Sequence, residues 1–264
     1  MLLAIDAGNS NILAGVFKDD RLVYDWRLLT DARKTADEYG ILLQNLYSSA
    51  NLKLEETKAV IIACVIPPLL GTLEEISRKY FHLDPFIIDA GVKTGITILY
   101  ENPGEVGADR IVNAAAGYEK YRKSLIIIDL GTATTFDCIS ERGEYLGGAI
   151  APGIMISSEA LFSKTSKLPR VELVKPEAAI GKNTVSSMRS GIIFGYVGLI
   201  DGMVKRIRKE MGGDPMVIAT GGLAPVIASE SETIDAVDTY LTLEGLRIIY
   251  RKNREPEKRD VYHR

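Results

Sequence analysis

The chain begins with short runs in which apolar positions dominate and turn residues intervene, a pattern typical of β-strands. Three such runs cover residues 2–6, 11–17 and 21–28, with turns at Gly8-Asn9 and Asp19-Asp20. They predict a meander of three strands. The same criteria predict further short strands at residues 60–63, 86–88, 94–98, 125–129, 134–140, 144–150 and 216–219.

Between these strands, apolar residues recur at three- and four-residue spacing, which predicts helices. The predicted helices cover residues 37–51, 67–76, 107–121, 185–211 and 241–250, with shorter ones after Pro152-Gly153 and Gly221-Gly222. Residues 164–183 are mixed and predict a loop-rich segment. The longest helix contains glycines at positions 191, 195, 198 and 202. Since interior glycines destabilise a helix, they indicate close helix packing, for which a subunit interface is one place.

One short pattern occurs twice, as Ile5-Asp6-Ala7-Gly8-Asn9 and as Ile128-Asp129-Leu130-Gly131-Thr132, with an offset of 123 residues between the aspartates (129 − 6). Each copy follows an apolar run and leads into a second run, a turn and another strand-like segment. Two copies of one β-turn-β unit favour a duplicated α/β fold, with a phosphate and a metal between its halves.

The length of 264 residues allows one large domain or two smaller ones, and the repeat favours two. We predict domains at residues 1–104 and 105–250, followed by a charged and mobile tail at 251–264. With 46% hydrophobic and 25% charged residues, the composition is that of a globular protein with a substantial core.

Bulk charge and rare residues exclude several function classes. The net charge of −3 gives no electrostatic case for nucleic acid or an anionic membrane. No apolar run approaches the ~18 residues that span a bilayer, and no export signal is visible, so we expect a cytoplasmic protein. Cys64 and Cys138 lack metal or redox spacing and are expected to fill the core. His82 and His263 lie in no motif, which argues against histidine-based catalysis.

The turn at residues 6–11 has the composition of a phosphate-binding turn. Glycine and short polar residues can direct backbone N–H groups at phosphate oxygens, and an aspartate ending a strand can hold Mg²⁺. A single copy could equally be a hairpin turn without a ligand. The second copy, together with Gly221-Gly222 after a strand, favours a nucleotide site. These features resemble the two phosphate hairpins and the adenosine turn of the actin, sugar-kinase and Hsp70 superfamily.

Competing nucleotide motifs are absent. Gly181-Lys182-Asn183-Thr184 resembles the end of a P-loop, but Pro176 stands where its first glycine belongs.

A second candidate site is the block Gly107-Ala108-Asp109-Arg110, where a loop runs into a predicted helix. In one interpretation Asp109 complements the helix dipole and Arg110 pairs with a surface acid. In the other, Asp109 accepts a proton from a substrate hydroxyl while Arg110 stabilises an anion. A loose phosphoryl-transfer transition state needs little proton removal, so it tolerates a carboxylate as the proton acceptor. Asp137 and Asp201, away from turns, are interpreted as structural.

Several blocks together are similar to the type III pantothenate kinase family, collinearly from residue 1 to about residue 250. They are Asp6 to Asn11, Asn102 to Arg110, Asp129 to Thr135, Gly147 to Gly153, and Gly181 to Thr184 before the glycine-rich helix. The resemblance implies duplicated actin-like (ribonuclease H-like) domains with mixed sheets flanked by helices. Ser10 stands where the family commonly has threonine, and the hydroxyl is retained.

The resemblance also implies the reaction and its residues. The reaction is ATP-dependent phosphorylation of pantothenate to 4′-phosphopantothenate, the first step of coenzyme A biosynthesis, with Asp109 as proton acceptor. The implied ATP-binding residues are Asp6, Ala7, Gly8, Asn9, Ser10, Asn11, Ile12, Leu13 and Thr132. The implied pantothenate-binding residues are Tyr100, Gly107, Ala108, Asp109, Arg110 and Thr184. Asp6 would lie near Mg²⁺, Asp129 would hold K⁺ or NH₄⁺, and the pantothenate pocket would lie at a homodimer interface.

Two alternatives remain open at this point. One is another kinase or a phosphatase of the same superfamily, acting on a sugar or another acid. The other is a non-catalytic accessory factor in transcription, which predicts damaged catalytic positions or a basic surface. Asp6, Asp109, Arg110 and Asp129 are all present and the chain is slightly acidic, which favours the enzyme.

Overall fold

The computed structural model describes residues 1–89 and 91–254, which fall into two compact units. The first unit contains Met1–Gly95, Asn102–Ala116 and the residues from Thr242 onward, and the second contains Ile96–Glu101 and Gly117–Leu241. The division therefore differs from the predicted boundary after residue 104. The reason is that segments from the middle and the end of the chain pack on the first sheet. A unit composed of separate segments cannot be described by a single boundary in the sequence.

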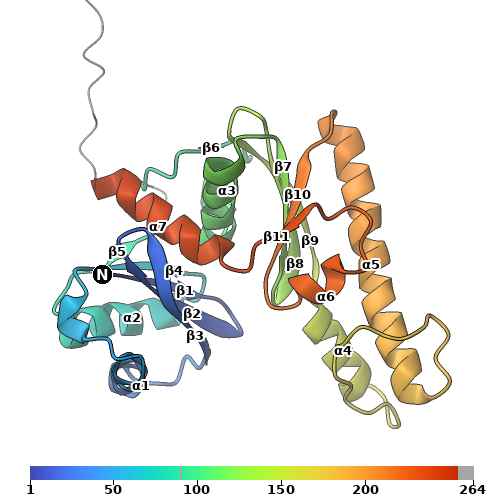
Figure 1. Ribbon diagram of the computed structural model, residues 1–264, viewed down its shortest axis with the longest axis horizontal. Helices are drawn as coiled ribbons and strands as arrows, with labels where there is room; N and C mark the ends of the chain where they lie inside the picture. The colour runs from blue at the N-terminus through green and yellow to red at the C-terminus, as the bar shows by residue number, and fades with distance from the viewer. Residues whose placement is uncertain (90, 255–264) are drawn as a thin grey trace, which may run out of the picture. The chain divides into compact units, whose positions relative to one another are not determined.

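The first unit is built on a five-stranded mixed sheet in the order β3-β2-β1-β4-β5 (Figure 1). Its strands are β1 (Leu2–Ala7), β2 (Asn11–Lys18), β3 (Arg21–Leu29), β4 (Ala59–Cys64) and β5 (Phe86–Ile87). The strands β1, β2 and β3 pair antiparallel as the predicted meander, and β4 runs parallel to β1. Every residue of β4 is apolar and nearly all are buried, as expected for a strand covered on both faces.

Helices cover both faces of this sheet. On one face, α1 (Ala36–Ser49) and α2 (Pro67–Tyr80) share a core with Leu3, Ile5 and Ile62. On the other, the start of α3 (Ala108–Tyr121) and α7 (Leu241–Arg254) pack on Ala4 and Ile61. Gly245 allows the helices α3 and α7 to approach closely. A Cβ at this position would lie only 2.4 Å from the carbonyl oxygen of Val112. The short 3₁₀ helices are η1 (Leu54–Glu56) and η2 (Pro103–Glu105).

The second unit repeats this topology in a sheet of order β11-β10-β7-β8-β9-β6. Its strands are β6 (Thr97–Ile98), β7 (Leu125–Leu130), β8 (Ala133–Ile139), β9 (Glu144–Pro152), β10 (Met216–Thr220) and β11 (Ala236–Val237). Read from β9 to β11, the order 9-8-7-10-11 matches 3-2-1-4-5 of the first sheet. The predicted duplication is thus confirmed. The additional strand β6 pairs with β9 and is shorter than the predicted run at residues 94–98.

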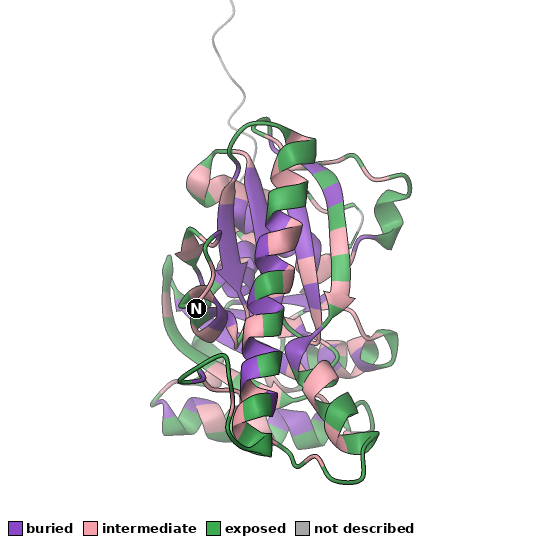
Figure 2. Ribbon diagram, turned by 90° about the vertical axis from the view of Figure 1, so that its right-hand side faces the viewer, coloured by how far each residue is buried: buried purple, intermediate pink, exposed green. Residues whose placement is uncertain are grey.

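One face of the second sheet packs against α4 (Ile154–Ser163), α5 (Thr184–Met211) and α6 (Ala224–Ala228). Figure 2 shows α5 along its length, with buried and exposed residues alternating as the helix turns. Residues 164–183 contain no helix or strand, as predicted. In the described part of the chain, no helix is both long and apolar enough to cross a bilayer.

The prediction that a mobile tail starts at residue 251 is wrong for its first four residues, because α7 continues to Arg254. The side-chain amide of Asn253 donates to the carbonyl oxygens of Ile249 (2.8 Å) and Lys93 (2.9 Å), and basic residues in the last turn complement the helix dipole. Residues 255–264 of the predicted tail lie outside the described residues.

Asp201, interpreted from sequence as structural, is a buried carboxylate of α5 that holds the loop before β11. It accepts hydrogen bonds from the hydroxyls of Ser231 (2.6 Å) and Thr233 (2.7 Å) and from the backbone N–H of Glu232 (3.2 Å). Burial by itself would raise the pKa of Asp201, but these hydrogen bonds outweigh it and hold the pKa below its ordinary value of 3.8.

We expect Asp201→Asn to lower the free energy of unfolding near neutral pH by about 1.5–3 kcal/mol, because a charged acceptor is lost. A depressed pKa stabilises the fold above the unfolded-state pKa, and this contribution is lost as the pH falls through the lower folded-state pKa. The difference from wild type should therefore shrink below about pH 3.8. Chemical denaturation across a pH series measures it, with the exposed Asp214→Asn as control. A difference that stays constant with pH would contradict the role of the charge.

Candidate functional site

The first hairpin joins β1 to β2 through a tight turn at the carboxyl end of β1, the central strand of the first sheet. The N–H of Gly8 donates to the carbonyl of Asn11 (3.0 Å). Thr30, which follows β3, stabilises the turn through two hydrogen bonds. Its hydroxyl donates to the Gly8 carbonyl (2.7 Å), and its backbone N–H donates to the Ser10 carbonyl (3.1 Å). Asp6 lies opposite Leu13 and Ala63 in the neighbouring strands. The turn is thus a fixed frame that leaves Asn9 and Ser10 exposed.

The second hairpin joins β7 to β8 in the same way, with the Gly131 N–H donating to the Ala133 carbonyl (3.1 Å). Asp129 lies opposite Thr135 on one side and Thr220 on the other, the counterpart of Asp6 in the first sheet.

Two glycines hold this second hairpin by contact with its backbone. The Gly153 N–H donates to the Thr132 carbonyl (3.1 Å), and a Cβ at Gly153 would lie only 2.1 Å from that oxygen. Gly221 has φ +94° and would place a Cβ 2.7 Å from the Leu130 carbonyl oxygen. Each position requires glycine, because a side chain at either one would push the hairpin away.

The block at residues 107–110 enters α3 as predicted, with Asp109 in the first turn. The Asp109 Oδ1 atom accepts a hydrogen bond from the Arg110 N–H at 2.8 Å, so the carboxylate is held at the helix start. A Cβ at Gly107 would lie 2.6 Å from the same Oδ1 atom. Arg110 is buried, with 8% of its surface exposed.

Val65 connects this block with the first hairpin inside the first unit. Its N–H donates to the Ala7 carbonyl (3.1 Å), and its Cγ1 atom would lie 3.8 Å from a Cβ at Gly107. The sequence reading missed Val65. The signal that could have found it is the parallel pairing of β4 with β1, which puts the residue after β4 beside the end of β1.

Cys64 lies opposite Ala7 in this pairing. Burial is the main reason that the pKa of its thiol is raised, and the negative charge of Asp6 adds to the effect. The thiol therefore stays protonated at neutral pH, which fits the predicted packing role. Among the described residues, no three His, Cys, Asp or Glu side chains gather into a metal cluster.

The remaining predicted residues belong to the second unit. Thr132 lies in the second hairpin, and Tyr100 follows β6 and is half-buried. Thr184 is the first residue of α5, whose start is capped by Asn183 through a hydrogen bond from the Ser186 N–H (2.9 Å). Gly181 packs on this start so closely that a Cβ would lie 2.3 Å from the Ser187 nitrogen.

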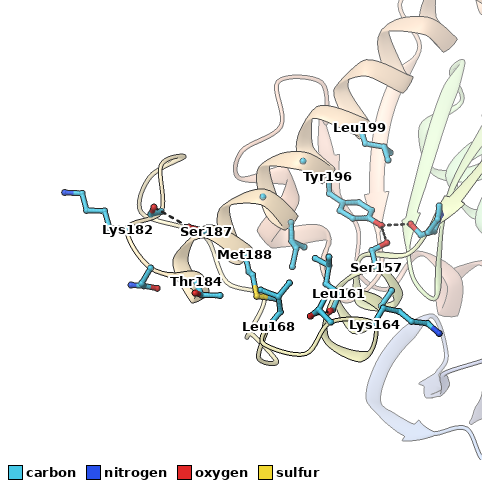
Figure 3. Close-up of a pocket in the computed structure, with 18 residues that line it drawn as sticks. Ser157, Leu161, Lys164, Leu168, Lys182, Thr184, Ser187, Met188, Tyr196 and Leu199 are labelled. Atoms are coloured by element: carbon cyan, nitrogen blue, oxygen red, sulfur yellow. Dashed lines mark hydrogen bonds between the residues drawn. The ribbon is translucent and has the colours of Figure 1, made fainter.

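A cavity of about 1240 Å³ lies between α4, the loop after it and α5, and Thr184 is part of its wall. Most of the lining is apolar, with Leu161, Leu168 and Met188 among its side chains. Figure 3 shows Thr184 and Lys182 toward one end and Tyr196 toward the other, where the tyrosine hydroxyl contacts Ser157 (2.5 Å) and donates to the Pro152 carbonyl (2.9 Å). Among the residues that line this cavity, Thr184 was predicted from the sequence as a site residue and the others were not.

The structure thus brings two groups of predicted residues together, each within one unit. In the first unit, the Asp6 hairpin and the Gly107–Arg110 block lie on either side of Val65. In the second unit, the hairpin at residues 129–132 contacts Gly153 and Gly221.

The family model of type III pantothenate kinase matches residues 2–206. A type III pantothenate kinase of Geobacter sulfurreducens is 60% identical over 255 residues, covering 97% of this chain and all of the relative.

The chain belongs to the type III pantothenate kinase family.

Two solved structures are similar to this chain in fold. A conserved protein of the Baf family of transcriptional activators from Campylobacter jejuni superposes with a TM-score of 0.59 at 20% identity, covering 95% of this chain and 98% of that one. MreB 5 of Spiroplasma citri, bound to AMPPNP, superposes with a TM-score of 0.54 at 12% identity, covering 96% of each chain. The predicted actin-like fold is confirmed, and at these identities the likeness concerns the fold alone.

Membership also decides the class of activity. Type III pantothenate kinases are phosphotransferases that act on pantothenate, so the chain is an enzyme of that class. The name of the Campylobacter jejuni protein does not favour the alternative of a non-catalytic accessory factor, because at 20% identity that likeness concerns the fold alone.

Proposed function

We propose that the chain transfers the γ-phosphoryl group of ATP to the primary hydroxyl of pantothenate, giving 4′-phosphopantothenate and ADP, with Asp109 as the proton acceptor. The observation that carries the assignment is the geometry of the carboxylate. It is fixed at the start of α3 by the Arg110 N–H, partly exposed, and next to a glycine that leaves room for it.

The step needs an attacking oxygen in line with the phosphorus and a proton acceptor beside that oxygen. Asp109 takes the hydroxyl proton as the new P–O bond forms and ADP leaves. Arg110 would add a fixed positive charge next to the reacting anions, where a buried cation is most effective. Most of the rate then comes from positioning and electrostatic stabilisation.

ATP would bind through the hairpin residues Asp6 to Leu13 and through Thr132. The rigid turn at Gly8 supports this, because N–H groups of a fixed turn can donate to phosphate oxygens without reorganisation.

The family's cations fit the carboxylates present. Mg²⁺ is usually held by one or two carboxylates together with substrate phosphates and water, which matches the single Asp6 at the end of β1. Asp129 occupies the equivalent place in the second sheet and would hold K⁺ or NH₄⁺. When bound, both ions offset negative charge on the phosphates.

Pantothenate would contact Tyr100, Thr184 and the block at residues 107–110.

We also propose a homodimer formed through α5. The helix exposes Gly191, Gly195 and Gly198, and a Cβ at any of these would meet nothing within 4 Å in this chain. Gly191 and Gly195 on this face also line the cavity that includes Thr184. A second copy packed on α5 would therefore cover this cavity. We expect the enzyme to act in the cytoplasm.

The function is tested by ADP release from purified protein with ATP, Mg²⁺ and K⁺, over a panel of pantothenate, hexoses and short hydroxy acids. Turnover confined to pantothenate, with the phosphorylated product identified by mass, is the expected result. Turnover of a sugar in preference to pantothenate would point to another kinase of the superfamily, and no turnover of any substrate would refute the proposal.

Removal of the monovalent cation should slow turnover, because the charge of Asp129 and of the phosphates is then left uncompensated. We expect kcat in buffer free of K⁺ and NH₄⁺ to fall at least about tenfold and to return on addition of either ion. Na⁺ at equal ionic strength is the control for screening. Equal rates with and without K⁺ would remove the cation from the mechanism.

Substitution of Gly195 by arginine should separate the proposed dimer. The side chain projects into open space, so the fold of the chain should remain intact while a large charge blocks close helix packing. Light scattering should show a monomer with a raised KM for pantothenate. Gly71→Arg, at an exposed helix glycine of α2 with equally open space, should remain a dimer. Dimers in both variants would rule out this face.

A further inference from the structure

Tyr100 rests on two residues of β9. Its ring centroid lies 6.3 Å from that of Tyr145, with the planes inclined by 59°. It also lies above Gly147, where a Cβ would come within 3.5 Å of the Tyr100 ring. The pairing of β8 with β9 shifts register at this point and Gly147 has φ +113°, so the backbone of β9 bulges beneath the ring. Such bulges reorient a strand beside functional sites.

Tyr145 is itself held in place by a hydrogen bond to Asp137. Its hydroxyl donates to Asp137 Oδ1 at 2.7 Å, and both side chains are fully buried. The other carboxylate oxygen of Asp137 accepts from the Thr135 hydroxyl at 3.2 Å, and Thr135 pairs across the strands with Asp129. A buried carboxyl group is tolerated only with such partners, and the partners in turn hold its orientation.

These contacts restrict where the Tyr100 ring can lie. Tyr145 cannot turn away without leaving the Asp137 carboxyl with one donor fewer in the core. Gly147 cannot be replaced without both strain at positive φ and crowding under the ring. Packing of the core alone would need neither a buried carboxyl group under a tyrosine nor a bulge with a glycine.

We propose that Asp137, Tyr145 and Gly147 form a platform that fixes the Tyr100 ring in the orientation that binds pantothenate. Asp137 and Tyr145 are then positioning residues that act through Tyr100 and do not touch the substrate. This inference rests on the proposed function, because it takes Tyr100 as a pantothenate contact.

Tyr145→Phe tests the platform, since it removes the hydroxyl and keeps the ring. We expect the KM for pantothenate to rise roughly three- to tenfold, the effect of one buried hydrogen bond, while kcat and the KM for ATP change less than about twofold. Tyr118→Phe is the matched control. It removes a hydroxyl that donates to the Glu141 carbonyl (3.3 Å) in the same unit, and it should leave every kinetic constant unchanged.

A double-mutant cycle separates positioning from general stability. In the Tyr100→Ala background, a further Tyr145→Phe should leave the KM for pantothenate unchanged, because the residue that the platform supports is gone. Additive effects on KM would overturn the proposal. So would a Tyr145→Phe variant with a lower melting temperature but a normal KM. If the wild-type protein does not turn over pantothenate, the proposed function itself fails, and the substrate role of Tyr100 fails with it.

Discussion

Asp109→Asn should reduce kcat at least about a hundredfold while the KM for ATP and the melting temperature stay near wild type. Asparagine has the size of aspartate, and its carbonyl oxygen can still accept the Arg110 N–H that Asp109 accepts at 2.8 Å. The fold around the start of α3 is therefore preserved. The amide cannot take a proton at neutral pH, so the attacking hydroxyl loses its acceptor, a loss that commonly reduces rates by about 10²–10⁴.

The measurement is ADP release under saturating ATP and pantothenate, with ATP binding followed by calorimetry. Asp84→Asn is a suitable control because it makes the same change at an exposed aspartate of the same unit, where only an ion pair with Arg78 is lost. We expect it to behave as wild type. Near-normal turnover by Asp109→Asn would remove Asp109 from the role of proton acceptor, even with the enzyme assignment intact.

Gly153→Ala should disable the enzyme by displacing the backbone of the second hairpin. Its Cβ would lie 2.1 Å from the Thr132 carbonyl oxygen and 2.5 Å from that of Gly131, and both are backbone atoms that cannot rotate away. The hairpin must therefore shift by about 1 Å or more. Misplacement of that size can cost about a hundredfold in rate, and we expect this loss in kcat/KM for ATP. Crowding should also lower stability by about 1–3 kcal/mol.

Steady-state kinetics with varied ATP and a thermal melt measure the two effects. Gly71→Ala is the control, since a Cβ there meets nothing within 4 Å and should slightly stabilise α2. If Gly153→Ala binds ATP normally, then the second hairpin does not depend on this contact, and its assignment to ATP through Thr132 loses its structural support.

Much of the fold follows from local pattern. The runs at residues 2–6, 11–17 and 21–28 became β1, β2 and β3 almost to the residue, because hairpin strands are bounded by turn residues that the sequence displays. The repeated Asp-x-Gly unit predicted the duplicated sheet. The division of the chain into units was harder, since α7 joins the first unit from the far end of the sequence, and only three-dimensional packing on Ala4 and Ile61 brings it there.

The candidate site shows the same contrast. The sequence placed Asp109 in the first turn of a helix correctly, because a loop-to-helix transition is a local signal. It could not show that Gly153 and Gly221 contact the hairpin at residues 129–132, or that Val65 lies between Ala7 and Gly107. These contacts join residues far apart in the chain. Asp137 was interpreted as structural from sequence, and its burial agrees, but its link to Tyr145 depends on the register of β8 and β9.

The glycines of α5 imply a trade between folding and assembly. Four of them, at positions 191, 195, 198 and 202, together forgo about 4 kcal/mol of helix stability relative to alanine. Three of the four, Gly191, Gly195 and Gly198, face open space, so alanine would fit there without a clash in the single chain. Alanine at these three positions would therefore stabilise the helix in the single chain. Under the proposed pairing, the glycines instead allow a second backbone to approach closely, so the separated subunit is the weaker form of the protein.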